Sequence, residues 1–419
     1  MSVSDVFITD VEASDLKLMD GREGMLHHPY QQLRSIPGSN RMDVRIVNFN
    51  NPSFGARNDV QIPSMDLIPH EMYVEFKLGA EGTVTGAEWE PTPTWLTQQG
   101  VDLNYKEVSI YNLSEAECLM STLLDEKPVN WAKKQDLIGF NDPDADNAQR
   151  LYLPLNVLCS QVLSKVGPLS AYASNDWSVS VDLRAENKCM GGSTTEETPD
   201  AALNGMRLII LGSKAPYGEV ALAREALMKN GIVWNFLRSN HFRATLSDNT
   251  GSTTTYDQTY SSLVGALSHV RLILRDKTKF DASTSSGKNN VSYDVFEGVD
   301  DIMNVGKTSN PYEVWGQNLP QVFARDFFSA KSVEGAGRYI SADGSGGVSD
   351  SGIIDIAFAE SIADLEFGTS TGSYPVKNDL QISLTMASDT LHDIYLDTVA
   401  YTHVLGVITA GIANVNLSA

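Results

Sequence analysis

The segment NDWSVSVDL at residues 175–183 has a close counterpart, NDLQISLTM, at residues 378–386. In both copies the apolar residues occupy every second position: Trp177, Val179, Val181 and Leu183 in the first, and Leu380, Ile382, Leu384 and Met386 in the second. This period of two is typical of a β-strand with one buried face. Another apolar run follows each copy, at residues 206–211 and 399–408. The sequence therefore predicts two similar β domains in tandem.

The size and composition of the chain suit a globular protein with two cores. Its 419 residues allow two β-sandwiches of about 200 residues each. Apolar residues make up 42% of the chain and charged residues 20%, and no run of about 18 apolar residues occurs, so we expect no membrane span. The segment from Met1 to Asp5 has neither a basic start nor an apolar stretch, so we expect no signal peptide.

The three cysteines are Cys118, Cys159 and Cys189, and none has the CxxC spacing of a metal or redox site. We interpret them as buried free thiols, which is typical of a protein that folds in a reducing cytoplasm. The net charge of −22 disfavours nucleic-acid binding, because an acidic surface repels phosphate. A local exception is Arg34, Arg41 and Arg45, for which a solvated strand edge is favoured over contact with lipid headgroups or an acidic partner.

From Arg41 onwards the pattern is that of strands separated by turns. Met42, Val44 and Ile46 alternate with charged residues, which predicts a strand with one apolar face. Pro154 indicates that its strand lies at a sheet edge or bend. Further strands are expected at residues 72–78, 151–155, 232–246 and 270–275.

Helices are expected at two places. Ser114 and Glu117 have the spacing of a capping box, and the helix they begin ends before Pro128. Proline near the start and glycine just past the end predict a linker helix at residues 216–231. The expected organisation is therefore an N-terminal arm at residues 1–35, a first β domain at 36–215, the linker helix, and a second β domain with long surface loops at 232–419.

Motifs of catalysis and cofactor binding are weak or absent in the sequence. Neither GxSxG nor HExxH occurs. Gly306-Lys307-Thr308 resembles the end of a phosphate-binding loop, but Asp301 stands where the first glycine belongs and no apolar strand is expected directly before it. Abundant Asp and Glu leave a catalytic carboxylate pair possible in principle, yet nothing singles one out. We expect no enzyme activity, no cofactor and no catalytic residue.

Metal binding has one candidate, the loop with Asp142, Asp144 and Asp146 at alternate positions. An EF-hand would need glycine and glutamate where Asn147 and Leu153 stand, so a solvated acidic turn is favoured. The only adjacent histidines, His27 and His28, are interpreted as surface residues. We expect no metal site.

Aromatic residues could line a sugar-binding cleft. Trp177 continues a buried alternation and is assigned to the core, whereas Trp89 and Trp95 flank a Pro-Thr-Pro loop and are the better candidates for exposed contacts.

The order of these segments resembles that of the double jelly-roll major capsid proteins, a family that includes capsomers of tailless membrane-containing bacteriophages, large eukaryotic DNA viruses and the adenovirus hexon. The resemblance covers roughly residues 36–419. It rests on a proline-containing strand, a Pro-Leu turn, an alternating strand and a closing strand in the first half, and on closing strands in the second. These segments are residues 151–155, 167–172, 175–183 and 203–211, and then 323–327, 353–358, 378–386 and 401–408.

The resemblance implies an all-β fold of two tandem eight-stranded jelly rolls, with the linker helix and a few loop helices. It implies homotrimers that look hexagonal and tile an icosahedral shell with neighbouring capsomers. The protein would then be a structural component of the virion, assembled in the host cytoplasm. The arm at residues 1–35 matches no family motif and is left as a segment available to penton, minor capsid or internal-membrane components.

Two other classes stay open at the level of sequence. One is a carbohydrate-binding host-attachment protein built from β-sandwiches, and the other is a structural protein of a phage tail or baseplate. A glycan-binding screen separates the first from a capsid protein, and electron microscopy of the purified protein separates the second.

Overall fold

The computed structural model describes about half of the chain. The described residues are 41–64, 67–80, 88–106, 108–118, 137–139, 148–155, 176–191, 203–214, 232–247, 254–261, 263, 265–277, 302–306, 319–320, 353–357, 374–376, 380–386, 393–408 and 415–418. The predicted arm at 1–35, the predicted linker helix at 216–231 and the acidic loop at 142–147 lie outside them.

The first half forms two four-stranded antiparallel sheets, which we name 1A and 1B. Sheet 1A has the order β1-β10-β3-β7, and sheet 1B has the order β2-β8-β5-β6. The strands are β1 (Arg41–Asn48), β2 (Arg57–Ile62), β3 (Leu67–Leu78), β5 (Leu96–Tyr105), β6 (Val108–Leu113), β7 (Gln149–Pro154), β8 (Trp177–Leu183) and β10 (Leu203–Lys214). A small ribbon of β4 (Glu88–Trp89) and β9 (Met190–Gly191) and the 3₁₀ turns η1 (Thr92–Trp95) and η3 (Glu186–Lys188) accompany them.

The second half repeats the arrangement in sheets 2A and 2B. Sheet 2A contains β11-β19-β13-β16, with β17 paired to β13 and β20 paired to β19, and sheet 2B contains β12-β18-β14-β15. The strands are β11 (Ile232–Leu246), β12 (Thr254–Tyr260), β13 (Gly265–Asp276), β14 (Ile302–Gly306), β15 (Leu319–Pro320), β16 (Ile353–Ala357), β17 (Tyr374–Val376), β18 (Leu380–Met386), β19 (Ile394–Ile408) and β20 (Val415–Ser418).

The two halves have the same topology. Each half has eight strands in its two sheets when β4, β9, β17 and β20 are left out. If these eight are numbered 1 to 8 along the chain, the strand orders of the two sheets are 1-8-3-6 and 2-7-4-5 in both halves. The repeated segments become β8 and β18, the seventh strand of each half, and the apolar runs after them become β10 and β19, the eighth. The predicted tandem of eight-stranded jelly rolls is confirmed.

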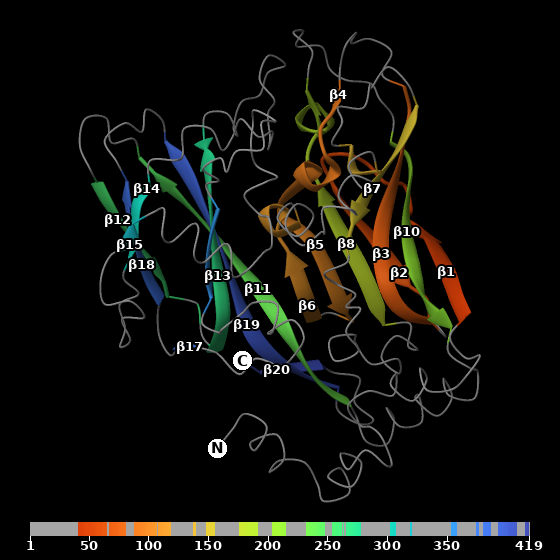
Figure 1. The fold of residues 1–419 in the computed structure, drawn as a ribbon. Helices are drawn as coiled ribbons and strands as arrows, with labels where there is room; N and C mark the ends of the chain where they lie inside the picture. The colour runs from red at the N-terminus through yellow and green to blue at the C-terminus, as the bar shows by residue number, and fades with distance from the viewer. Residues whose placement is uncertain are drawn as a thin grey trace, which may run out of the picture.

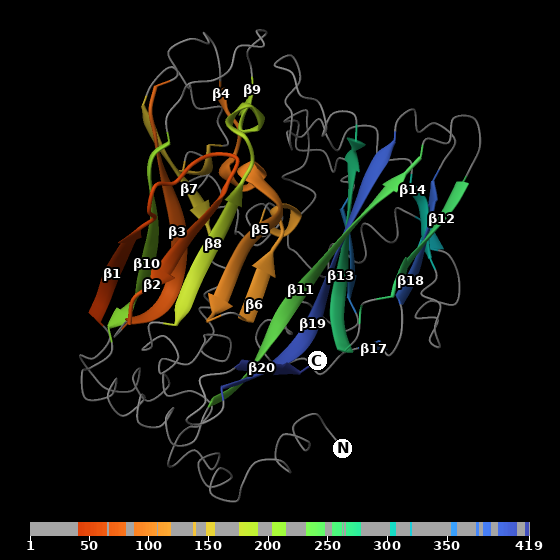
Figure 2. The same cartoon turned by 180° about the vertical axis from the view of Figure 1, so that it is seen from behind.

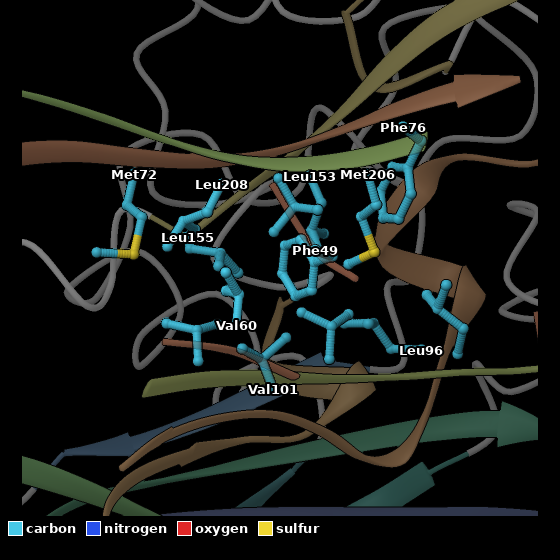
Figure 3. Packing of buried hydrophobic residues seen from close by; sticks show 14 of the residues in the cluster. Phe49, Val60, Met72, Phe76, Leu96, Val101, Leu153, Leu155, Met206 and Leu208 are labelled. Carbon is cyan, nitrogen blue, oxygen red and sulfur yellow. The ribbon is translucent and has the colours of Figure 1, made fainter. Parts of the chain in front are cut away.

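The first core lies between sheets 1A and 1B (Figure 3). Side chains of Met72, Phe76 and Met206 from sheet 1A face Val60 and Val101 from sheet 1B. All five are buried, and in β8 the alternation from Trp177 to Leu183 points into this core as predicted. The alternation of apolar residues therefore produces the sandwich, because each strand buries one face.

Several local predictions are also confirmed. Strand β7, which ends at Pro154, is an edge strand of sheet 1A. The amide of Glu117 donates to Ser114 Oγ at 3.3 Å, and residues 115–118 are helical, so the predicted cap begins a helix there. The continuation beyond Cys118 lies outside the described residues.

Strand β1 departs from the expected burial. It forms where predicted, but the side chains of Val44 and Ile46 are 46% and 51% exposed. They pair with Leu211 and Ile209 of β10, whose neighbours Leu208 and Ile210 are the ones that enter the core. The apolar face of β1 therefore points away from the sandwich.

The two rolls lie side by side, with β6 of the first next to β11 of the second (Figures 1 and 2). In both views β1 lies at the end of the first roll that is remote from the second, and β12 lies at the far end of the second. The sheets thus follow one another from 1A and 1B to 2A and 2B. Among the residues that the structure describes, no helix is long and apolar enough to cross a membrane.

Candidate functional site: the contact between the two rolls

Sheet 2A carries buried polar side chains on the face turned away from its own core. Thr398 of β19 points inward, because its hydroxyl lies 2.6 Å from the hydroxyl of Tyr260 in sheet 2B. The neighbouring residue Asp397 therefore points outward, and it is fully buried nonetheless. Its partner in the strand register is Arg243 of β11. This outer face is where the first roll is packed.

A bidentate ion pair forms the centre of this face. Arg243 donates from Nε to Oδ1 of Asp397 at 2.7 Å and from Nη2 to Oδ2 at 3.2 Å. His241 Nε2 lies 2.8 Å from the same Oδ1. Two parallel charge-assisted bonds hold a guanidinium and a carboxylate in one plane. Because Asp397 has no contact with solvent, this pairing satisfies a charge that would otherwise be strongly unfavourable.

Glu115 extends this pair across the boundary between the rolls. It lies in the helical turn after β6, its side chain is fully buried, and its Oε2 is 3.7 Å from Arg243 Nη2 in the second roll. The same oxygen is 3.9 Å from Arg184 Nη2 in the first roll. Arg184 is held in turn by a 2.7 Å bond from Nε to the carbonyl oxygen of Leu96. One carboxylate thus bridges arginines from both rolls, and we call Arg184, Glu115, Arg243 and Asp397 the inter-roll network.

A direct hydrogen bond strengthens the same contact. Ser239 Oγ, on β11, donates to the carbonyl oxygen of Asn112, on β6, at 2.9 Å. Further along the face the ring of His269 stacks on Tyr401 with centroids 4.0 Å apart, and Ser268 Oγ lies 3.0 Å from His269 Nδ1. The contact is therefore polar, buried and directional, which favours one fixed orientation of the rolls.

The outer face of sheet 1A has a different character. At one end, Glu75 is buried and accepts from Arg207, from Tyr152 at 3.3 Å and from Arg150 at 3.4 Å. Burial alone would raise the pKa of Glu75, but the hydrogen bond and charge of Arg207, with help from Arg150 and Tyr152, lower it. At the other end, four apolar residues of β1 and β10 lie beside Tyr73 and Glu71 of β3, and the Tyr73 hydroxyl donates to Glu71 at 2.8 Å. The apolar residues are Val44, Ile46, Ile209 and Leu211.

The described residues offer little that resembles an active site. They contain no group of three or more His, Cys, Asp or Glu that could hold a metal ion. Cys118 and Cys189 are buried, as predicted for thiols in a core. Burial, with Glu117 and Glu115 nearby, raises the pKa of the Cys118 thiol well above its usual value, and burial likewise raises that of Cys189. Neither thiol is therefore a reactive nucleophile at neutral pH. Cys159 lies outside the described residues.

The tryptophans correct a sequence-based expectation. Trp89 and Trp95 were the candidates for exposed sugar contacts, but both are fully buried. Their rings pack against each other at 51° with centroids 5.2 Å apart, and Phe54 stacks on Trp89. The Trp95 indole donates to the carbonyl oxygen of Glu90 at 2.8 Å. The Pro-Thr-Pro segment forms the buried turn η1 and not an exposed loop, which places the two rings in the core. The assignment of Trp177 to the core is confirmed.

The structure describes only some of the remaining candidate residues named from the sequence. Strand β14 ends at Gly306, so the expectation that no strand precedes Gly306 was wrong, while Lys307 and Thr308 lie outside the described residues. Asp142, Asp144, Asp146, His27 and His28 lie outside them too. Of the basic group, Arg45 is exposed on the edge strand β1, as expected for a strand edge, and Arg34 is not among the described residues.

Sequence reasoning missed the inter-roll network. Its members come from four separate segments, and nothing in their local patterns distinguishes them from solvated charges. One signal was available: Asp397 and Arg243 each stand in a long strand of otherwise mostly uncharged residues. A charge in such a strand calls for a partner, but the partner's identity depends on the fold.

The two jelly rolls, equal in topology and joined in tandem, define the double jelly-roll fold. No family model and no curated protein matches the sequence. Solved structures do match: the chain is 14% identical to the protein in the quasi-atomic model of the PBCV-1 virus capsid, over 91% of this chain and 97% of that one, with a TM-score of 0.68. The Faustovirus major capsid protein is 10% identical, over 87% and 90%, with a TM-score of 0.60. The mavirus major capsid protein is 9% identical, over 91% and 90%, with a TM-score of 0.50. The likeness establishes the fold of this chain as the one those capsid proteins have.

Proposed function

We propose that this chain is a viral major capsid protein whose homotrimers form pseudo-hexagonal capsomers that tile an icosahedral shell. The observation that carries the proposal is the repeated topology together with a structural likeness that spans nearly the whole of both chains. Because each chain contains two similar rolls, three copies of the chain contribute six similar units. A trimer of such chains approximates a hexagon, and hexagons tile a surface.

The proposed role is mechanical and not catalytic. The buried polar groups at the contact between the rolls are paired with one another, and they fix an orientation without offering a reactive group to solvent. A rigid angle between the rolls is what a repeating shell requires, because each capsomer must present the same edges. We propose that the protein is a structural component of the virion with no enzyme activity, assembled in the host cytoplasm.

The proposed organisation keeps the boundaries expected from the sequence. The first jelly roll comprises residues 36–215, the linker helix 216–231 and the second jelly roll 232–419. Residues 1–35 form an arm that is available for penton, minor capsid or internal-membrane components. Direct binding to nucleic acid is not part of this function, because the chain has 53 acidic against 31 basic residues.

Oligomeric state and shape test the proposal together. The purified full-length chain should have three times the monomer mass of 45.7 kDa by light scattering, and electron micrographs should show particles with a hexagonal outline. A monomer at all accessible concentrations, or elongated fibres, would overturn the proposal. Rings of another symmetry would favour a phage tail or baseplate protein.

The carbohydrate-binding alternative is weakened by the burial of Trp89 and Trp95. An exposed aromatic platform was its main support in the sequence. Binding to a glycan array by a monomeric chain would reinstate it.

A further inference from the structure

Two contacts join the rolls at separate points along strand β11, which lies next to β6 (Figures 1 and 2). At one point Ser239 Oγ donates to the carbonyl oxygen of Asn112 at 2.9 Å. At the other, Arg243 Nη2 lies 3.7 Å from Oε2 of Glu115. The two β11 residues are four positions apart, which is about 13 Å along a strand. One contact alone would act as a pivot, whereas two separated contacts fix the angle between the rolls. We call this pair of contacts the two-point anchor.

Each side of the anchor is fixed within its own roll. In the second roll, Arg243 is held by two bonds to Asp397 of β19, at 2.7 and 3.2 Å. In the first roll, Ser114 Oγ accepts from the amide of Glu117 at 3.3 Å and begins the helical turn that carries Glu115. Both Asp397 and Glu115 are fully buried, so the loss of a cationic partner would be unfavourable for either carboxylate. The anchor therefore fixes the orientation of sheet 2A relative to the first roll.

A ring of three identical chains needs a defined rotation from each chain to the next. Threefold symmetry uses head-to-tail contacts, and the ring closes only when the rotation per chain is about 120°. In a chain with two rolls, this rotation is the sum of the angle between the rolls and the angle at the contact between chains. An error of about 10° between the rolls would add up to about 30° over three chains. The last contact could then not form with the geometry of the others, and open chains or rings of another number would result.

We propose that the two-point anchor determines the number of chains in the capsomer, with Glu115 and Ser239 as its positioning residues. The inference rests on the proposed trimer and concerns how the trimer closes, not whether the chains associate. Glu115 is fully buried within one chain, and Ser239 is only 7% exposed. A weaker anchor should therefore leave the surfaces that join the chains intact and change the number of chains that they join.

The test weakens both contacts of the anchor in the full chain. Glu115→Gln combined with Ser239→Ala takes away one charge and one hydroxyl. The ratio of trimers to all other oligomers should fall at least about fivefold, which is the effect of one lost hydrogen bond. Open chains and rings of another number should replace the trimers. Mass photometry counts each species, and hydrogen exchange in residues 177–183 and 380–386 shows whether both rolls are folded.

The matched control makes the same two chemical changes away from the anchor. Asp59→Asn alters an exposed carboxylate, and Thr97→Ala removes a hydroxyl that bonds to Asp182 at 2.7 Å within the first roll. This double variant should remain trimeric. Ser239→Thr keeps the hydroxyl and should remain trimeric too, whereas Ser239→Ala alone should shift the distribution in the same direction as the anchor double variant. If the anchor double variant does not fold, this pair of single variants decides the question.

The outcomes separate this inference from the proposed function. A wild-type chain that is monomeric overturns both. A wild-type trimer that persists in Ser239→Ala and in the folded anchor double variant retains the capsomer and overturns the role of the anchor. Anchor variants that are folded but only monomeric also overturn it, because the anchor would then support association itself and not the closure of the ring.

Discussion

Asp397 illustrates how a single charged residue can define the contact between two domains. It is fully buried. Its two oxygens accept two hydrogen bonds from Arg243, and Oδ1 also contacts His241 Nε2. In a low-dielectric environment such a carboxylate is tolerated only while its partners stay in place. The residue therefore restricts the geometry around it.

We expect Arg243→Ala to lower the free energy of unfolding by about 3 kcal/mol, because Asp397 and Glu115 would each lose a buried cationic partner. Urea denaturation measures the change. Lys277→Ala serves as a control, since Lys277 pairs at 3.5 Å with Asp393 and both side chains are partly exposed. That change should stay below about 1 kcal/mol. Equal effects of the two substitutions would contradict the importance we assign to burial.

The buried Glu75, with its partners Arg207, Arg150 and Tyr152, predicts a dependence of stability on pH. Since the folded pKa of Glu75 lies below the unfolded value, the ionised form stabilises the fold above pH 4.5, and this contribution is lost as the pH falls through the folded pKa. Glu75→Gln should therefore cost about 2 kcal/mol at pH 7 and less at pH 3. Urea denaturation across this pH range checks it, with the exposed substitution Asp59→Asn as control. If the difference in unfolding free energy between wild type and Glu75→Gln were larger at pH 3 than at pH 7, the predicted direction of the pH dependence would be wrong.

At the scale of elements, strands were predictable because the alternation of apolar and polar residues is a local property of the sequence. Strands β8 and β18 both lie where the alternation placed them. The alternation does not predict whether the apolar face of a strand points into the sandwich or away from it. Val44 and Ile46 alternate as well as Met72 and Val74 do, yet the first pair is exposed and the second buried. An alternation defines two faces, and the neighbouring sheets decide which one is covered.

Strand β5 contains a glycine that its backbone requires. Gly100 has φ of +64°, and a Cβ there would overlap the carbonyl oxygen of Leu113 in β6. We expect Gly100→Ala to lower the free energy of unfolding by at least about 2 kcal/mol, measured by urea denaturation. Gly205→Ala is the matched control, because its Cβ would meet only the flexible Lys77 side chain, at 3.7 Å. If both variants unfold alike, backbone strain at Gly100 is not the reason for the glycine.

At the scale of the whole molecule, the inter-roll network should couple the stability of the two rolls. Wild-type protein should unfold in one calorimetric transition, whereas Glu115→Ala combined with Ser239→Ala should separate it into two. Thr97→Ala is the control, since its 2.7 Å bond to Asp182 lies within the first roll. It should shift the transition without splitting it. A single sharp transition in the double variant would mean that other contacts join the rolls.

The sequence by itself determined the all-β class, the tandem repeat and half of the strands that the structure describes, because alternation and turn residues act over a few neighbouring positions. It also placed Trp177, Cys118 and Cys189 in the core. Only the tertiary structure decided that Trp89 and Trp95 are buried, that β1 turns its apolar face outward, and that Glu115, Arg184, Arg243 and Asp397 meet. The reason is physical: burial and ion pairing depend on which distant segments share a surface, and that is decided only when the sheets of each roll and the two rolls pack together.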